Sequence, residues 1–400
     1  MRFTKPKKVI GLDIGSQSVK AVQASRSGRG MSIEQTGVAT IDRNLLNSDP
    51  VAATARAIRD AIGDFAISQS MIVGALPGQS VVIRYPRLRN VSYEDLAEAV
   101  EQEASQNIPY DLSEVLLDWS LLEEEGEGEN AQQKILLVAS KHDVIDQRIQ
   151  FADIAEIEYS ILSVDSLALA DAAEECKFFN PNETAVLINI GASAVSIHFT
   201  KDGQSNFIRD VNWGAKELIQ AIAKANRLEY EDAEEQLMEQ GDELSDTIGG
   251  DDVVDVQAVD APDVVVEVDD DDDDIGLETA SPQAAASSAM SAAPQEVTLA
   301  DTLSAPIARL VTEVRRSFDY YEHQLYEHPV ERIILSGGIA HIPLIRDALM
   351  GELGIDEVTV ADPSAGAISL SRKVNMSRGN VHPAQYMVAV GLAARGLSEL

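Results

Sequence analysis

The sequence contains one short motif twice, and the two copies lie almost half the chain apart. The first copy, Leu12–Val19, reads Leu-Asp-Ile-Gly-Ser-Gln-Ser-Val, and the second, Ile188–Val195, reads Ile-Asn-Ile-Gly-Ala-Ser-Ala-Val. A further glycine follows in the next turn, Gly28 after the first copy and Gly203 after the second. Solenoid repeats recur after only tens of residues, so a separation this large predicts two similar lobes.

Each copy is predicted to lie in the same series of elements: strand, turn, strand, turn, strand and then helix. In the first copy the strands are Val9–Gly15, Val19–Ala24 and Ser32–Ala39. The helix that follows is Asp49–Ile67 in the first copy and Asn212–Arg227 in the second. A chain of 400 residues has room for two such lobes, and mixed strands and helices predict an α/β fold.

The motif combines an acid or an amide at a strand end with a glycine and small residues. Gly15 and Gly191 permit a tight turn, and consecutive backbone N–H groups of such a turn point into one concavity, which suits phosphate. The alternative for either turn alone is an ordinary hairpin. The duplication at matching positions favours two turns that face each other across a cleft and grip a polyphosphate from both sides.

Two charged side chains of the first copy fit the phosphate interpretation. Asp13 would face a phosphate-bound Mg²⁺ through water, because Mg²⁺ keeps several of its waters. Lys20 can reach a phosphate oxygen as a point charge.

A third glycine site lies nearer the end of the chain. Pro329–Gly338 is an apolar segment that ends in the pair Gly337-Gly338, and a helix over Leu344–Leu353 follows. A glycine pair at a strand end lets a flat ligand lie directly on the backbone. The pattern is common, so it supports a ligand site only together with the two phosphate turns.

Composition excludes several classes of function. The net charge of −36 argues against nucleic acid as the main partner and against direct docking on anionic lipid, since both need a basic face. The single cysteine, Cys176, excludes a disulfide framework and suits a reducing cytosol. No signal peptide and no membrane-spanning segment is predicted, because no apolar run is long enough.

One segment differs from the rest of the chain. There is no Lys or Arg between Arg227 and Arg309, and Asp242–Glu278 contains sixteen acidic residues. A stretch rich in Ser, Ala and Pro comes next. Such a composition cannot bury enough apolar area to offset its ordering entropy, so residues 242–296 are predicted to form a disordered acidic insert. Two roles stay open for it, a solvated spacer or a docking segment for a basic partner.

The three glycine motifs together resemble the actin-like ATPase superfamily, which includes actin, Hsp70, sugar kinases and FtsA. Leu12–Lys20 is similar to its first phosphate loop, Ile188–Val195 to its second, and Leu335–Pro343 to its adenosine motif. Ala168–Ala173 and Val388–Ala394 are similar to its two connector helices. The resemblance implies a two-lobed, ribonuclease H-like fold that holds ATP and Mg²⁺ between the lobes.

Within this superfamily the chain is most similar to the PilM family of type IV pilus assembly proteins. The segments that carry this resemblance are Asp13–Lys20, Asn107–Pro109, Leu116–Trp119, Ile135–Ala139, Val164–Ala170 and Asp362-Pro363. The resemblance implies a first lobe (1A) of residues 1–70, 141–183 and 380–400, an inserted 1C subdomain of residues 71–140, and a second lobe (2A/2B) of residues 184–241 and 297–379.

The resemblance also implies a set of site residues. The expected ATP-binding residues are Asp13, Gly15, Ser16, Gln17, Ser18, Lys20, Asn189, Gly191, Ala192, Ser193, Glu235, Gly337, Gly338 and Ile339, with Asp13 also holding Mg²⁺ through water. Three positions depart from the superfamily pattern: Asn189 replaces an aspartate, Gln236 stands where a lysine is usual, and Ile339 replaces a small residue. A neutral amide cannot share a divalent charge or help polarise a nucleophile. No catalytic residue is therefore assigned, and ATP binding with slow or no hydrolysis is expected.

The family resemblance further implies a cytoplasmic scaffold that is peripheral to the inner membrane through its partners. It would hold the N-terminal peptide of a PilN-like inner-membrane protein in a groove between subdomains 1A and 1C. The strands around Val81–Tyr85 and Leu116–Leu122 would line that groove. Pilus assembly ATPases are further expected partners.

Two other functions remain open. A small-molecule kinase of the same fold needs a carboxylate base beside the acceptor hydroxyl, and Asp165 is the nearest candidate, although the PilM interpretation makes it the cap of a connector helix. An FtsA-like cell-division protein is expected to end in a basic amphipathic helix, which the segment up to Leu400 does not resemble. ATP turnover with an added sugar or acid would favour the kinase.

Overall fold

The computed structural model describes residues 7–28, 30–89, 91–126, 132–246, 298–325, 327–377 and 381–400. The predicted acidic insert lies outside the described residues from residue 247 onwards. Its first residues differ from the prediction, because Gly241–Asp246 form a 3-10 helix that packs on the second lobe. The acidic composition predicts disorder, but contacts with other elements of the second lobe hold these residues in a helical turn.

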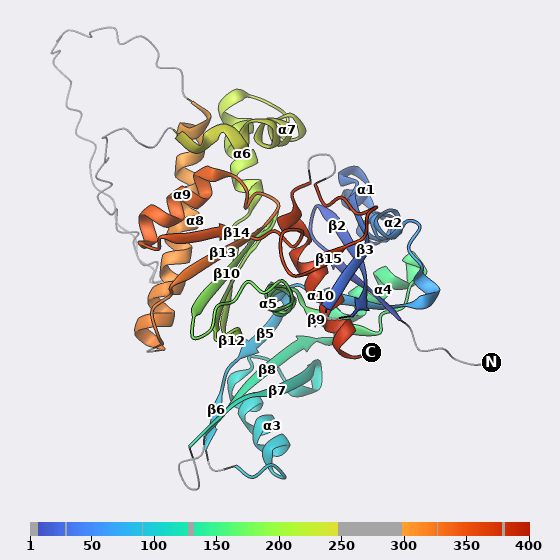
Figure 1. The fold of residues 1–400 in the computed structure, drawn as a ribbon, viewed down its shortest axis with the longest axis vertical. Coiled ribbons are helices and arrows are strands. Elements are labelled where there is room, and N and C mark those ends of the chain that lie inside the picture. Colours follow the sequence, from blue (N-terminus) through green and yellow to red (C-terminus); the bar gives the residue numbers. More distant parts are fainter. Residues whose placement is uncertain are drawn as a thin grey trace, which may run out of the picture.

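The first lobe is built on a six-stranded sheet (Figure 1). Its strands, in spatial order, are β15 (Ser369–Leu370), β3 (Gly30–Thr40), β2 (Ser18–Ser27), β1 (Lys8–Ile14), β4 (Ser70–Leu76) and β9 (Ile161–Val164). β1, β2 and β3 are antiparallel, whereas β4 and β9 add in parallel. Helices α2 (Pro50–Ile62) and α4 (His142–Ala155) cover one face with an apolar core.

The second lobe repeats this arrangement. Its sheet has the order β12 (Gln204–Val211), β11 (Val195–Lys201), β10 (Thr184–Ile190), β13 (Arg332–Gly337) and β14 (Glu357–Val360), with the same strand directions. One face is covered by α6 (Ala215–Asn226), α7 (Tyr230–Gln240), α8 (Leu299–Asp319) and α9 (Pro343–Leu353). Gly28 and Gly203 both adopt positive φ, at 60° and 77°, in the matching turns. The predicted duplication is therefore present in the topology.

Two helices fill the space between the sheets, as expected for the connectors. They are α5 (Asp165–Glu175), which lies against the second sheet, and α10 (Met387–Ser398), which lies against the first. Their backbones approach closely: a Cβ at Gly391 would lie 1.7 Å from the Ala168 carbonyl oxygen. Only a glycine fits there, so the small residues of this stretch follow from the packing of one connector on the other.

A separate small subdomain is inserted after β4 (Figure 1, below the two lobes). It contains β5 (Val81–Arg84), β6 (Arg87–Arg89), α3 (Leu96–Asn107), β7 (Val115–Glu125) and β8 (Gln132–Lys141). β8 is central, with β7 on one side and β5 and β6 on the other. Alternate residues of β8, Ile135, Leu137 and Ala139, are buried under α3. The chain enters this subdomain through the 3-10 helix Gly78–Ser80.

Two boundaries differ from the expected division of the chain. β4 pairs with β1, so the segment from residue 71 to Leu76 belongs to the first lobe and the insertion begins near Gly78. β15 pairs with β3, so Ser369–Leu370 also belongs to the first lobe, although they were expected in the second. The apolar pattern of a short strand does not specify its partner, and here the partner is set by chain segments far away in sequence.

The first predicted helix is also divided. A short helix α1 (Arg43–Ser48) precedes α2, and α2 ends at Ile62 rather than Ile67. Asp42 caps α1 and Asp49 caps α2 through their carboxylates. Among the described residues, no helix combines the length and the apolar character that a membrane crossing requires.

Candidate functional site

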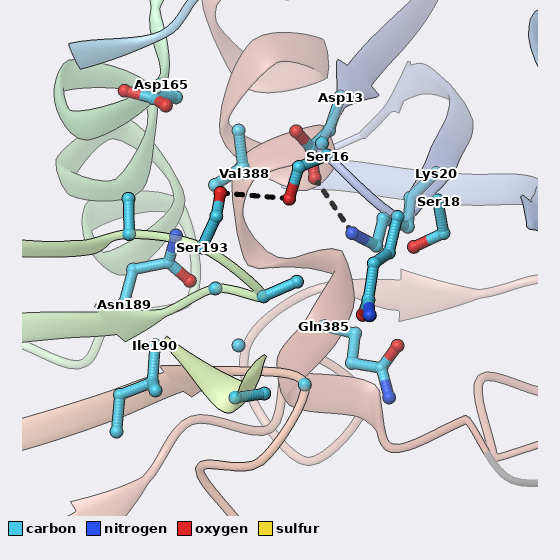
Figure 2. Close-up of a pocket in the computed structure, with 18 of the residues that line it drawn as sticks. Asp13, Ser16, Ser18, Lys20, Asp165, Asn189, Ile190, Ser193, Gln385 and Val388 are labelled. Atoms are coloured by element: carbon cyan, nitrogen blue, oxygen red, sulfur yellow. Dashed lines mark hydrogen bonds and ion pairs between the residues drawn. The ribbon is translucent and has the colours of Figure 1, made fainter. Parts of the chain in front are cut away.

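A cleft of about 910 Å³ lies between the two lobes, and it contains every residue expected at the nucleotide site (Figure 2). These residues are Asp13, Gly15, Ser16, Gln17, Ser18, Lys20, Asn189, Gly191, Ala192, Ser193, Glu235, Gly337, Gly338 and Ile339. They come from β1, β2, β10, α7 and β13 and from the turns that follow these strands. The structure thus brings together three motifs that are widely separated in the sequence.

The two glycine turns have the same geometry and face one another. The Gly15 N–H donates to the Ser18 carbonyl at 3.1 Å, and the Gly191 N–H donates to the Ala194 carbonyl at 2.9 Å. Across the cleft, the Ser193 hydroxyl donates to the Ser16 hydroxyl at 3.0 Å (Figure 2). Side chains of the two turns are therefore within hydrogen-bonding distance, and both turns line the same cleft.

The first turn carries a charged pair. Asp13 and Lys20 are opposite each other in the β1–β2 register, and Lys20 Nζ lies 3.6 Å from Asp13 Oδ2 (Figure 2). Their side chains are about one-sixth exposed and line the cleft. The pair places one cation and one carboxylate beside the turn, which are the groups that bind a phosphate oxygen and a hydrated divalent cation.

The second turn carries no charge at the matching positions. Asn189 and Ser196 occupy the places of Asp13 and Lys20 in the β10–β11 register. Asn189 Oδ1 accepts a hydrogen bond from the Ser336 hydroxyl at 3.1 Å. One acceptor position of the amide oxygen is therefore used by the neighbouring strand, and the side chain brings no charge to the cleft.

The glycine pair after β13 forms a flat surface. Gly337 has φ of 102°, and a Cβ there would lie 2.1 Å from the Ile190 carbonyl oxygen. At Gly338 a Cβ would meet no atom within 4 Å, so its surface is open towards the cleft. Glu235 on α7 lines the same part of the cleft, and Ile339 is fully buried behind the pair. This part of the cleft can accept a planar ring.

The base of the cleft contains acids that the expected site did not include. Asp165, the first residue of α5, accepts hydrogen bonds from the Ser166 N–H at 2.6 Å and from the Gly78 N–H at 2.9 Å. Burial, together with the charges of Asp210 and Asp13, raises the pKa of Asp165 to about 7. Burial also raises the pKa of Asp210. The sequence already offered Asp165 as a candidate base for a kinase, whereas nothing local marks Asp210.

Asp165 was expected to cap the connector helix, and its role differs from this expectation in one respect. The residue at the N-cap position is Val164, and no side chain caps the helix there. Asp165 is already helical, and its carboxylate joins the helix start to the Gly78 turn, where the inserted subdomain begins. Its side chain lines the cleft as well (Figure 2).

The outer edge of the cleft is bridged by Arg43. Its guanidinium contacts Glu231 at 2.7 Å and Glu234 at 2.5 Å, and it lies over the ring of Tyr230 at 4.1 Å. Gln17 donates to the Tyr230 hydroxyl at 3.2 Å. These contacts join α1 and the first turn to α7 of the other lobe. Because α1 was not predicted, no sequence signal pointed to Arg43.

Comparison with known proteins decides the family. The sequence pattern of the family described as "Type IV pilus assembly protein PilM" matches residues 11–245 and 279–397. The chain belongs to this family. The resemblance found in the sequence motifs is thereby confirmed, and so is the two-lobed actin-like fold.

The chain also matches solved structures to different degrees. A structure described as "PilM-PilN type IV pilus biogenesis complex" has a TM-score of 0.73 and 20% identity, covering 98% of this chain and 99% of that one. The ethanolamine utilization protein EutJ from Carboxydothermus hydrogenoformans has a TM-score of 0.49 and 11% identity, with coverage of 98% and 90%. MreB 5 of Spiroplasma citri bound to AMPPNP has a TM-score of 0.46 and 12% identity, with coverage of 97% and 95%.

Proposed function

We propose that this member of the PilM family binds ATP and Mg²⁺ between its lobes and serves as a scaffold of the type IV pilus assembly platform. In this role it holds the N-terminal peptide of a PilN-like inner-membrane protein on its inserted subdomain. The observation that carries the nucleotide part is the pair of matched glycine turns that meet across one cleft. A ligand held by both turns fastens the two lobes to each other.

The residues of the cleft fit ATP. The turns after Gly15 and Gly191 supply backbone N–H groups to a polyphosphate chain, and Lys20 adds a positive charge on the first side. The open surface of Gly338 accommodates the base, since no side chain stands over it.

Mg²⁺ fits beside Asp13. Among the residues that the structure describes, no group of three or more His, Cys, Asp or Glu is placed to hold a metal ion by itself. A Mg²⁺ ion that keeps most of its waters and uses phosphate oxygens needs only one nearby carboxylate, and Asp13 supplies it. When bound, the ion neutralises part of the phosphate charge.

Hydrolysis is proposed to be slow or absent. Asn189 presents a neutral amide where a carboxylate would share the metal charge. Asp165, a half-buried acid that lines the cleft, uses its carboxylate to hold two backbone N–H groups. The nucleotide then acts as a structural clamp whose lifetime is long.

The inserted subdomain offers an apolar surface for a peptide. One face of its sheet is covered by α3, while the other face carries side chains that stay partly exposed. These side chains are Val81, Ile83, Leu116, Leu136 and Val138, which the strand registers place on one side. Leu116 is 57% exposed, an unusual state for a leucine in a strand. Within the described part of the chain, β7 pairs with β8 alone, which leaves its outer edge for an added strand.

The occupant proposed for this surface is the N-terminal cytoplasmic peptide of a PilN-like protein. The similar solved structure is a complex of PilM with PilN, which supports this choice. The net charge of −36 argues against direct attachment to anionic lipid or nucleic acid. We also propose that the protein lies in the cytoplasm and is held at the inner membrane by this partner. Pilus assembly ATPases are proposed as further partners.

Calorimetry tests the nucleotide part. Asp13→Ala and Lys20→Ala are expected to weaken Mg²⁺-ATP binding by roughly 10-fold or more, because each removes a charge-assisted contact worth about 1.5–3 kcal/mol. Lys8→Ala is the matched control, since Lys8 pairs with Glu34 at the far end of β1. Equal ATP affinity in both cleft variants and the control would contradict the proposal.

Fluorescence anisotropy tests the peptide part. The probe is a labelled synthetic peptide with the N-terminal cytoplasmic sequence of the PilN-like protein from the same organism. Leu116→Asp should weaken its binding about 10-fold, since it removes apolar contact area and adds a charge to be desolvated. Leu228→Asp, at an exposed leucine of the second lobe, is the control and should bind as the wild type does. Equal binding by both variants would refute the surface.

A small-molecule kinase is the second candidate, and Asp165 is the observation that favours it. A carboxyl group with a pKa of about 7 at the base of the cleft has the properties of a general base. ATP consumption measured with a panel of sugars and hydroxy acids distinguishes the two functions. Turnover that depends on one added acceptor and is lost in Asp165→Asn would favour the kinase over the scaffold.

A further inference from the structure

Strand β5 of the inserted subdomain is tied at both ends to the first turn of the connector helix α5. Before the strand, the Gly78 N–H donates to Asp165 Oδ1 at 2.9 Å. The fit is tight, because a Cβ at Gly78 would lie 2.5 Å from Asp210 Oδ2. The entry to the subdomain is therefore held between two acids that line the nucleotide cleft.

After the strand, a chain of polar groups, half-buried at Tyr85 and Ser205 and buried at His198 and Ser166, leads back to the same helical turn. The Tyr85 hydroxyl lies 2.6 Å from Ser205 Oγ, and Ser205 Oγ lies 2.7 Å from His198 Nε2. On the other side of the ring, His198 Nδ1 lies 2.9 Å from the carbonyl oxygen of Ser166. Tyr85 belongs to the inserted subdomain, Ser205 and His198 to the second lobe, and Ser166 to α5.

The direction of every hydrogen bond in this chain is fixed. The Ser166 carbonyl can only accept, so His198 Nδ1 carries the hydrogen. Burial lowers the pKa of His198 to about 4, which keeps the ring neutral and leaves Nε2 as an acceptor for the Ser205 hydroxyl. Ser205 Oγ then accepts from Tyr85. No member can turn away without leaving a buried polar group unpaired, since His198 is fully buried.

A parallel contact between the same two bodies leads elsewhere. Lys134 of β8 donates to Asn206, and Asn206 donates to the Tyr321 hydroxyl at 2.7 Å. Tyr321 lies in the π-helical turn Tyr320–Gln324 at the end of α8, away from the connector helix. Both chains join the inserted subdomain to the second lobe, but only the one through His198 reaches the helical turn that also lines the cleft.

We propose that the hydrogen-bonded chain Tyr85–Ser205–His198–Ser166 couples nucleotide occupancy of the cleft to peptide binding on the inserted subdomain. The inference rests on the proposed function. A ligand between the lobes sets their angle and with it the position of the first turn of α5, and β5 follows because both of its ends are tied to that turn. His198 and Ser205 are positioning residues that touch neither ligand. By linkage, the peptide alters nucleotide affinity by the same factor.

The test measures that factor in three variants. The affinity of the labelled PilN-like peptide is determined with and without Mg²⁺-AMPPNP in the wild type, in Tyr85→Phe and in Ser205→Ala. Tyr321→Phe is the matched control, because it removes a buried hydroxyl from the parallel contact. The wild type and Tyr321→Phe are expected to change peptide affinity about fivefold or more on adding nucleotide. In Tyr85→Phe and Ser205→Ala the ratio should fall to about one. In Ser205→Ala, which lies outside the expected peptide groove, each ligand alone should bind within about twofold of the wild type.

A second measurement needs no ligand. Hydrogen exchange of the amides in residues 165–169 should be at least about threefold faster in Tyr85→Phe than in the wild type or Tyr321→Phe. In this variant Ser205 loses the Tyr85 hydroxyl, so Ser205 and His198, which holds the Ser166 carbonyl, are less firmly oriented. Tyr85→Phe serves better than His198→Leu, because the latter would leave the Ser166 carbonyl and the Ser205 hydroxyl without this partner. Unchanged exchange, or a wild-type ratio retained in Tyr85→Phe, overturns the coupling. A wild type that binds both ligands with no mutual effect also overturns it and leaves the proposed function standing, whereas a wild type that binds neither overturns the proposed function.

Discussion

The two copies of the glycine turn share a backbone and differ in their side chains. Both turns close with the same N–H to carbonyl hydrogen bond, and both follow the first strand of an equivalent sheet. The first copy presents Asp13 and Lys20 to the cleft, and the second presents Asn189 and Ser196 at the same register positions. The comparison teaches that the backbone of the turn is duplicated, whereas the charged side chains at these register positions come from one lobe only.

The largest expected effect concerns Asp165, the cleft-lining acid whose pKa is raised by burial and by the charges of Asp210 and Asp13. A folded-state pKa of about 7 for Asp165 means that the folded protein binds this proton more tightly than the unfolded chain. Stability from this group is therefore present at low pH and is lost as the pH rises from about 4 to 7. Asp165→Asn keeps the acceptor oxygen for Gly78 and Ser166 but cannot ionise.

Urea unfolding of both proteins between pH 5 and pH 8 measures this effect. The free energy of unfolding of the wild type should fall relative to that of Asp165→Asn by about 2–3 kcal/mol over this range, at about 1.4 kcal/mol for each unit of pKa shift. A difference that stays constant with pH would mean that Asp165 is ionised throughout, and that the acid of the first copy does not influence it.

The second prediction tests the position at which the first turn carries a lysine and the second turn a serine. Lys20→Ser gives the first copy the residue type of the second, and Mg²⁺-ATP affinity should fall about 10-fold, because a charge-assisted contact is lost. Ser196→Ala, at the equivalent place in the second copy, should change the affinity less than about twofold. Calorimetric titration of both variants decides the matter. Similar losses at the two positions would show that the lobes contribute equally.

A third prediction restores the missing acid of the second copy. Asn189→Asp should raise the rate of ATP hydrolysis several-fold, because a carboxylate can share the metal charge and still accept from Ser336. Steady-state phosphate release is the measurement, and Asn226→Asp, remote on α6, is the control. An unchanged rate in Asn189→Asp would indicate that hydrolysis is limited by another feature of the cleft.

The smallest effect is expected outside the turns, where Arg43 bridges the lobes. Its side chain is one-third exposed and Glu231 is mostly exposed, so solvent screens the pair and its contribution to closure is modest. Arg43→Ala should raise the dissociation rate of a fluorescent ATP analogue about twofold to threefold. Arg56→Ala is the control, since Arg56 pairs with Asp60 within α2. Stopped-flow displacement giving the same rate for both variants would show that closure depends on the turns alone.

Much of this architecture was predictable because its causes are local. The repeated motif, the apolar strands around it and the glycine turns are properties of short segments, and they identified the two lobes and the residues of the cleft. The connector helices were recognisable for a similar reason: small residues are required where α5 and α10 approach most closely.

Other features were decided only when distant segments came together. The sequence determined that Met71–Leu76 is a strand, but pairing with β1 placed it in the first lobe. It contained Asp165, Asp210 and Gly78 without any sign that they meet at one junction. Strand period, turn chemistry and helix caps act over a few residues, whereas partner choice, burial and shifted pKa values arise from groups that are neighbours only in the folded chain.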